Sequence, residues 1–253
     1  MPTHRRRHLI AAVAALALAG LAGCGTADRA GTAAPATTAA AAASPTASAG
    51  PSFDPGMALA LSIGKPYSAT VLLTSTIDGK PGFTGSGRMN NGDLFTGRIE
   101  MRAAEPSADG RTVHFESVLT ETSAYARDLA GPGPWRKLPR SADATLADYG
   151  AFARALATRG AEARKGPELL DGVPAYRFAG RFESAELETL DPRTARSLAA
   201  KGVAGFDCDL WIDRQGRTVR FEQRVELSGL RALNTAVFRE FGEPETFTAP
   251  DGS

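Results

Sequence analysis

From about residue 56 onward, the chain consists largely of short segments in which apolar and polar side chains alternate. In 218–227, for example, Phe221 and Val225 would point to one side of a strand and Arg224 to the other. A period of two is that of a β-strand with one buried and one solvated face. Asp-Gly and Asn-Gly pairs separate several segments and tolerate the positive φ angles of tight hairpin turns. The pattern therefore restricts the chain to a mainly antiparallel sheet.

Two further segments have the helical period. One covers 141–160, where Tyr149 and Leu156 are at helical spacing, and the other begins with Asp191 as N-cap and Pro192 at the first helical position. Strands are expected over 67–77, 82–89, 94–103, 113–129, 173–182, 205–213, 218–227 and 232–241, with a short edge at 135–138. This order predicts an α+β domain in which helices lie on one face of a long, curled antiparallel sheet. The charged faces, which include Asp207, Asp209 and Asp213, are expected to be solvated surface and not a binding site.

The N-terminus is a segment of another kind. A basic patch at 4–8 precedes an uncharged apolar run over 9–23, which is too short to span a membrane and is typical of a secretory signal. The run ends in Leu21-Ala22-Gly23-Cys24, which resembles the lipobox of bacterial lipoproteins. We therefore expect 1–23 to be a signal peptide and the Cys24 thiol to accept a diacylglyceryl group of palmitate-type chains. An ordinary signal peptide that happens to contain a cysteine is the alternative.

Acylation at Cys24 would place the protein outside the cytoplasm, anchored to the outer face of the cell membrane, because two or three acyl chains hold firmly. Residues 24–55 contain mostly Ala, Thr, Pro, Ser and Gly, so the segment after the lipidated cysteine should be a flexible tether. The remaining 56–250 suit a single domain.

Charge and side-chain chemistry exclude several classes of function. Without 1–23 the chain has 26 basic and 28 acidic residues and no basic cluster, which argues against nucleic acid as a partner. Only His114 and one unmodified cysteine, Cys208, remain, so we expect no disulfide within the monomer, no metal site and no cofactor. Cys208 is interpreted as a small buried hydrophobe, and no nucleophile elbow, Walker loop or zinc signature is present, which indicates a non-enzyme.

Four phrases of the sequence together resemble a known family. They are 123–129 (SAYARDL), 133–139 (GPWRKLP), 209–217 (DLWIDRQGR) and 241–250 (FGEPETFTAP). With the lipobox and the order of elements, they are similar to the LolA-like lipoproteins of actinobacteria, related to the LppX/LprG group. The resemblance covers roughly 56–250.

The resemblance implies a half-barrel whose concave face is covered by helices around an apolar cavity that holds acyl chains of lipids or glycolipids. The apolar sides of the strands supply the candidate lining residues: Phe95, Ile99, Met101, Phe115, Phe206, Leu210, Val219, Phe221 and Val225. Residue types alone do not decide whether there is a cavity, because any sheet that packs on helices needs an apolar face. The leading hypothesis is a monomeric lipid-binding carrier or chaperone. The alternative is an envelope sensor or assembly partner that uses the same fold to bind another protein.

Overall fold

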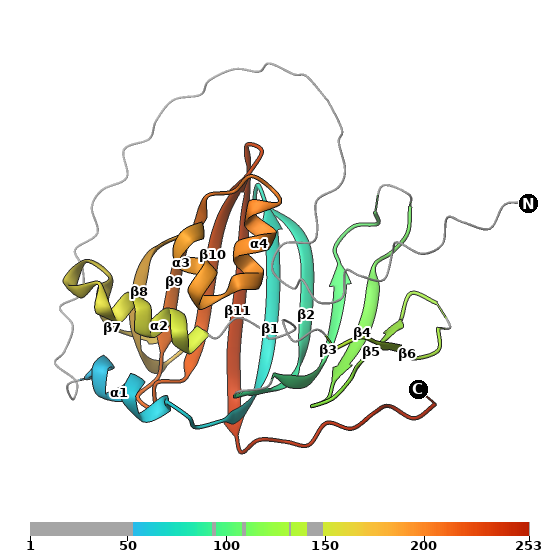
Figure 1. The fold of residues 1–253 in the computed structure, drawn as a ribbon, viewed down its shortest axis with the longest axis horizontal. Coiled ribbons are helices and arrows are strands. Elements are labelled where there is room, and N and C mark those ends of the chain that lie inside the picture. Colours follow the sequence, from blue (N-terminus) through green and yellow to red (C-terminus); the bar gives the residue numbers. More distant parts are fainter. Residues whose placement is uncertain (1–52, 93–94, 108–109, 132, 141–148, 253) are drawn as a thin grey trace, which may run out of the picture.

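The computed structural model describes residues 53–92, 95–107, 110–131, 133–140 and 149–252, where a single antiparallel sheet dominates (Figure 1). Its strands are β1 (Tyr67–Ile77), β2 (Lys80–Asn91), β3 (Thr96–Ala103), β4 (His114–Leu119), β5 (Ala124–Asp128), β6 (Arg136–Leu138), β7 (Arg164–Leu170), β8 (Val173–Glu183), β9 (Gly205–Ile212), β10 (Thr218–Leu227) and β11 (Leu230–Gly242). The spatial order of these 11 strands is β6-β5-β4-β3-β2-β1-β11-β10-β9-β8-β7. The sheet is therefore open, with β6 and β7 at its edges and the first and last strands paired in its middle.

The described helices are α1 (Pro55–Ser62), α2 (Tyr149–Thr158), α3 (Ser184–Leu190) and α4 (Pro192–Ala199), with a 3-10 turn at Gly160–Glu162. In Figure 1, α2, α3 and α4 lie over the half of the sheet formed by β8–β11 and β1, whereas β3–β6 extend beyond them. The predicted α+β class, with helices on one face of a long antiparallel sheet, is confirmed. Among the described elements, however, the helices cover only half of that face.

Local sequence explains the turns and the helix start that were predicted. Asp78 and Gly79 have φ angles of 48° and 77°, and Asp171 and Gly172 have 52° and 81°, as an Asp-Gly hairpin turn requires. Asp191 is the N-cap of α4, and its side chain accepts a hydrogen bond from the backbone N–H of Thr194 at 3.0 Å.

Four features of the fold were not predicted. The segment 113–129 is a hairpin, because Thr120 and Ser123 close a turn between β4 and β5 with a 2.9 Å backbone hydrogen bond. Helix α1 and strand β7 have no clear periodicity and form by packing and by pairing with β8. Helix α3 begins with a capping box formed by its N-cap Glu183 and by Glu186 in its first turn, a signal that was present in the sequence.

The expectation that the charged strand faces are solvated is wrong for part of β9 and for Asp213 directly after it. Asp209 and Asp213 are only 3% and 5% exposed, whereas Asp207 is exposed. Asp209 lies between two guanidinium groups, with Arg177 Nη2 at 2.6 Å and Arg224 on the other oxygen. Long arginine stems from the neighbouring strands cover the carboxylate and neutralise it, which alternation within one strand does not reveal.

The two tryptophans occupy different environments. Trp211 is 6% exposed, with the guanidinium carbons of Arg177 and Arg220 at 5.3 Å and 5.4 Å from its ring centroid. Trp135 is half-buried beside the edge strand β6, with the Arg127 guanidinium 4.8 Å from its ring. Both rings therefore make cation–π contacts, and Trp211 fills a small apolar cluster outside the main core.

Candidate functional site

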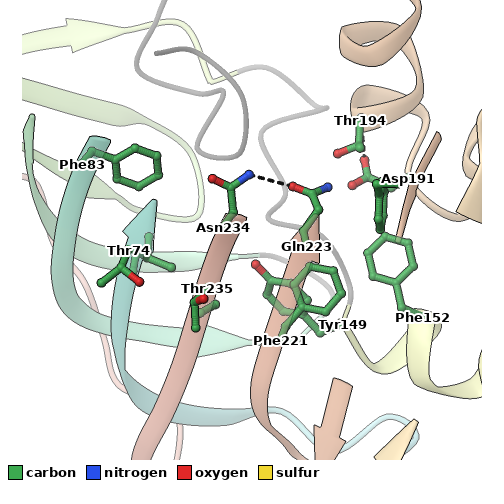
Figure 2. Close-up of a pocket in the computed structure, with 13 residues that line it drawn as sticks. Thr74, Phe83, Tyr149, Phe152, Asp191, Thr194, Phe221, Gln223, Asn234 and Thr235 are labelled. Carbon is green, nitrogen blue, oxygen red and sulfur yellow. Dashed lines mark hydrogen bonds between the residues drawn. The ribbon is translucent and has the colours of Figure 1, made fainter. Parts of the chain in front are cut away.

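The candidate site is a small cavity between the concave face of the sheet and helices α2 and α4, shown in Figure 2. Its volume is about 50 Å³, whereas pockets for drug-sized ligands have roughly 300–1,000 Å³. The residues that line it come from β1, β2, α2, α4 and β9–β11: Leu73, Thr74, Phe83, Tyr149, Phe152, Asp191, Thr194, Phe206, Phe221, Gln223, Asn234, Thr235 and Ala236. The cavity alone is therefore too small to enclose a long acyl chain.

Aromatic rings form one wall of this cavity. The Phe152 ring of α2 stacks on Phe221 of β10 with centroids 5.8 Å apart, and it lies 6.0 Å from Phe206 of β9. Tyr149 approaches Phe221 at 4.7 Å. Phe152 is only 2% exposed and fills the space between α2 and the sheet. One large side chain on the helix thus limits the volume of the cavity.

Polar groups also line the cavity. Gln223 Oε1 accepts a hydrogen bond from Asn234 Nδ2 at 3.0 Å, and both side chains lie on the concave face (Figure 2). Asp191, at the N-terminus of α4, also lines the cavity. Burial raises the pKa of Tyr149, and the nearby charge of Asp191 raises it further. The tyrosine therefore stays neutral, and the site combines an apolar wall with a few hydrogen-bonding groups.

The structure separates the nine residues proposed to line a cavity into groups. Phe206 and Phe221 line the cavity described here. Phe95, Ile99, Met101, Leu210 and Val225 are buried in the same continuous core, and Phe115 is half-buried against it. The residues on β1, β11 and α2 that complete the lining were not identified. Period-two alternation in β1 and β11 could have identified Leu73 and Ala236, but Phe152 required knowledge of the helix packing.

Val219 lies on the other side of the sheet. The register between β9 and β10 shifts between Thr218 and Arg220, so the alternation of side chains reverses at this point. Val219 consequently packs with Ala175 and Trp211 in the small cluster apart from the main core. A β-bulge cannot be read from the alternation that it interrupts, which is why the sequence placed Val219 on the concave face.

In the part of the chain that the structure describes, Cys208 and His114 are not placed together in a catalytic or metal site. Burial raises the pKa of Cys208 to about 12, so its thiol is protonated at neutral pH. His114 Nε2 lies 2.7 Å from Glu100 on the adjacent strand. Within the described ranges, no group of three His, Cys, Asp or Glu residues is placed to hold a metal ion.

The apolar face continues beyond the helices onto β2, β3 and β4. Phe83 lines the cavity and is half-buried, and Met101 and Phe115 follow on the next strands. Gly85 separates Leu73 from Met101 on this face, and a Cβ on Gly85 would collide with the Met101 sulfur. The glycine therefore lets Met101 lie across β2, and the apolar core is continuous from the cavity to Met101, with Phe83 and Phe115 partly buried against it.

No family model matches the chain, and no curated protein matches its sequence. Solved structures that match include LprF from Mycobacterium bovis, with TM-score 0.45 and 16% identity over 79% of this chain and 99% of that chain. The Mycobacterium tuberculosis lipoprotein LppX matches with TM-score 0.40 and 15% identity over 76% and 95% of the two chains. A DUF1329 family protein from Desulfovibrio piger matches with TM-score 0.27 and 9% identity over 75% and 91%.

LppX gives its name to the LppX/LprG group, which the sequence resembles. At these identities and TM-scores, no residue role is transferred to this chain. No helix among the described residues is long and apolar enough to cross a membrane.

Proposed function

We propose that the chain is an extracytoplasmic lipoprotein, anchored through Cys24, that binds acyl chains of a lipid or glycolipid on its concave apolar face as a carrier or chaperone. Cys24 and the signal peptide lie outside the described residues, so the anchor rests on the lipobox. The chain is proposed to be a non-enzyme and a monomer. The proposed domain covers 56–250, and Asp54, just before it, caps α1.

The observation that carries the proposal is the continuity of the apolar face past the helices. The buried core extends from β9 and β10 to Ile99 and Met101 of β3, and Phe83 and Phe115 are half-buried beside it. Among the described elements, α2, α3 and α4 lie over the other half of the sheet (Figure 1). An extended apolar core that is continuous with the cavity, and that is partly accessible only at Phe83 and Phe115, suits a long, thin ligand better than a compact one.

The volumes define how an acyl chain would bind. A cavity of about 50 Å³ has room only for the end of such a chain, so most of its methylenes would lie along β2–β4. Each buried CH₂ contributes about 0.8 kcal/mol, so even ten methylenes would supply on the order of 8 kcal/mol before the costs of ordering and association. The polar pair Gln223–Asn234 would contact the ligand where it enters between sheet and helices.

The test uses residues 25–253, which include every described element without the anchor. Organic extraction of the purified protein, followed by mass spectrometry, detects co-purified lipid, and a fluorescent fatty acid measures uptake. We expect Phe83→Ser and Phe115→Ser to weaken uptake at least about tenfold, since each removes roughly 1.5–3 kcal/mol of apolar contact. Leu72→Ser is the matched control, because Leu72 is an exposed apolar residue on β1.

Circular dichroism separates loss of binding from loss of folding. Absence of co-purified lipid together with absence of probe uptake would refute the carrier hypothesis and favour the sensor or assembly partner. Equal losses in Phe115→Ser and Leu72→Ser would show that the concave face has no special role in uptake.

A further inference from the structure

Exposed apolar side chains gather at one end of the molecule. Among the described residues, the five most exposed large apolar side chains are 47–72% accessible, and three others elsewhere are 39–43% accessible. The five are Met57, Leu61 and Ile63, in or directly after α1, and Leu169 and Val173, at the β7–β8 turn. We call these five residues the apolar end patch.

Contacts place both parts of the apolar end patch at the same end of the sheet. Helix α1 packs on the β9–β10 turn, where a Cβ on Gly216 would collide with the backbone of Ala58. That turn directly follows Ile212, whose register partner on β8 is Tyr176. Phe53, just before α1, stacks on Tyr176 with ring centroids 5.6 Å apart. The β7–β8 turn therefore lies beside the segment that leads into α1.

Helix α1 is held in place with its apolar side chains outward. Asp54 accepts hydrogen bonds from the backbone N–H groups of Gly56 at 2.8 Å and Met57 at 3.1 Å. Ala58 and Leu59 are buried in the core, whereas Met57 and Leu61 are exposed on a helix that has no charged residue. The packing against Gly216 fixes this orientation. Exposure of Met57 and Leu61 is therefore a property of the folded domain.

We propose that the apolar end patch rests in the outer leaflet of the membrane to which Cys24 is anchored. The chain enters the domain at this end through Phe53, which is 29 residues after Cys24. A flexible tether of that length, at roughly 5–6 Å × √n for n residues, would keep the domain within about 30 Å of the bilayer. Lys65 and Arg214 are exposed close to α1 and suit anionic headgroups. The Asp171 carboxylate beside Val173 is paired with Arg239 at 2.6 Å. This inference rests on the proposed anchor and is independent of the proposed ligand.

The orientation is tested on the acylated protein in vesicles of phosphatidylcholine and phosphatidylglycerol. Two variants are made in a Cys208→Ala background, one with Leu61→Cys and one with Leu230→Cys, and each is labelled with an environment-sensitive dye. Leu230 is the first residue of β11, at the end of that strand away from the apolar end patch. A nitroxide quencher in the acyl region should quench the dye at position 61 and leave that at 230 unaffected. Equal quenching at both positions, or none at either, would overturn the proposal. Mass spectrometry of the N-terminal peptide reports acylation separately, so a missing anchor is distinguished from a wrong orientation.

A second measurement uses residues 25–253 and the same vesicles. Met57→Ser/Leu61→Ser/Ile63→Ser should lower vesicle binding at least about tenfold, because three apolar side chains leave the interface. The matched control, Leu72→Ser/Val113→Ser/Leu230→Ser, should change binding less than about twofold. Equal losses in the two triple variants, or no vesicle binding by the parent chain, would contradict membrane contact through this patch and assign it to a protein partner.

Discussion

Phe152 is the residue whose replacement tests the packing of the site most directly. It is 2% exposed, and its ring lies 5.0 Å from Phe182, 6.0 Å from Phe206 and 5.8 Å from Phe221. Phe152→Ala should therefore lower the free energy of unfolding by about 3–5 kcal/mol, the range for a buried phenylalanine. For a domain of this size, that corresponds to a fall in Tm of roughly 6–20 °C.

The same substitution should enlarge the cavity beside Phe152 from about 50 Å³ toward the roughly 150 Å³ at which engineered apolar cavities bind benzene. Urea unfolding followed by circular dichroism measures the loss, and added benzene should stabilise the variant but not the parent protein. Phe115→Ala is the control, since Phe115 is half-buried on β4 and should cost clearly less. A loss below about 1 kcal/mol for Phe152→Ala, or equal losses for both variants, would refute the described packing.

Three further predictions concern charges and the thiol. Asp209→Ala should cost about 1–3 kcal/mol in urea unfolding, because it removes a buried carboxylate that accepts hydrogen bonds from two partly exposed guanidinium groups, whereas Asp207→Ala should cost at most about 1 kcal/mol. Burial alone would raise the pKa of Glu116, but its contacts with Arg98 and Arg127 outweigh this and lower the pKa in the folded protein. The stabilisation from Glu116 is therefore present above the unfolded-state pKa and is lost as the pH falls through the lower folded-state pKa. Glu116→Gln should make the free energy of unfolding depend less on pH across that acidic range, and an unchanged pH dependence would contradict the prediction. Because burial raises the pKa of Cys208 to about 12, a thiol reagent at pH 8 should modify it only after unfolding, and rapid modification of the native protein would contradict its burial.

The fold was predictable where the residues of one segment by themselves favour a turn, a helix start or a strand. The Asp-Gly pairs gave hairpin turns with positive φ, and Asp191 followed by Pro192 gave the start of α4. The strand expected over 67–77 is β1 with the same bounds. These signals depend on backbone preferences and on period-two burial, both of which act within a few residues.

The sequence pattern did not predict the structure correctly where a residue's burial or pairing depends on a second segment of the chain. Val219 faces away from the core because of a bulge in pairing with β9, and Asp209 is buried because arginines from neighbouring strands cover it. The local pattern of β10 or β9 contains neither fact. Likewise, β7 has no alternation and exists because β8 offers an edge to pair with.

The sequence by itself determined the antiparallel strands, the helix at Asp191, the apolar sides of most strands and the lipobox at Cys24, because each depends on neighbouring residues in the chain. Only the tertiary structure decided the size of the cavity, which depends on where α2 places Phe152 against the sheet. It also decided that α1 and the β7–β8 turn lie at the same end, since Leu169 comes 106 positions after Ile63 in the chain. Contacts between distant segments arise from packing and strand pairing, which are set by the whole fold and not by any single stretch of sequence.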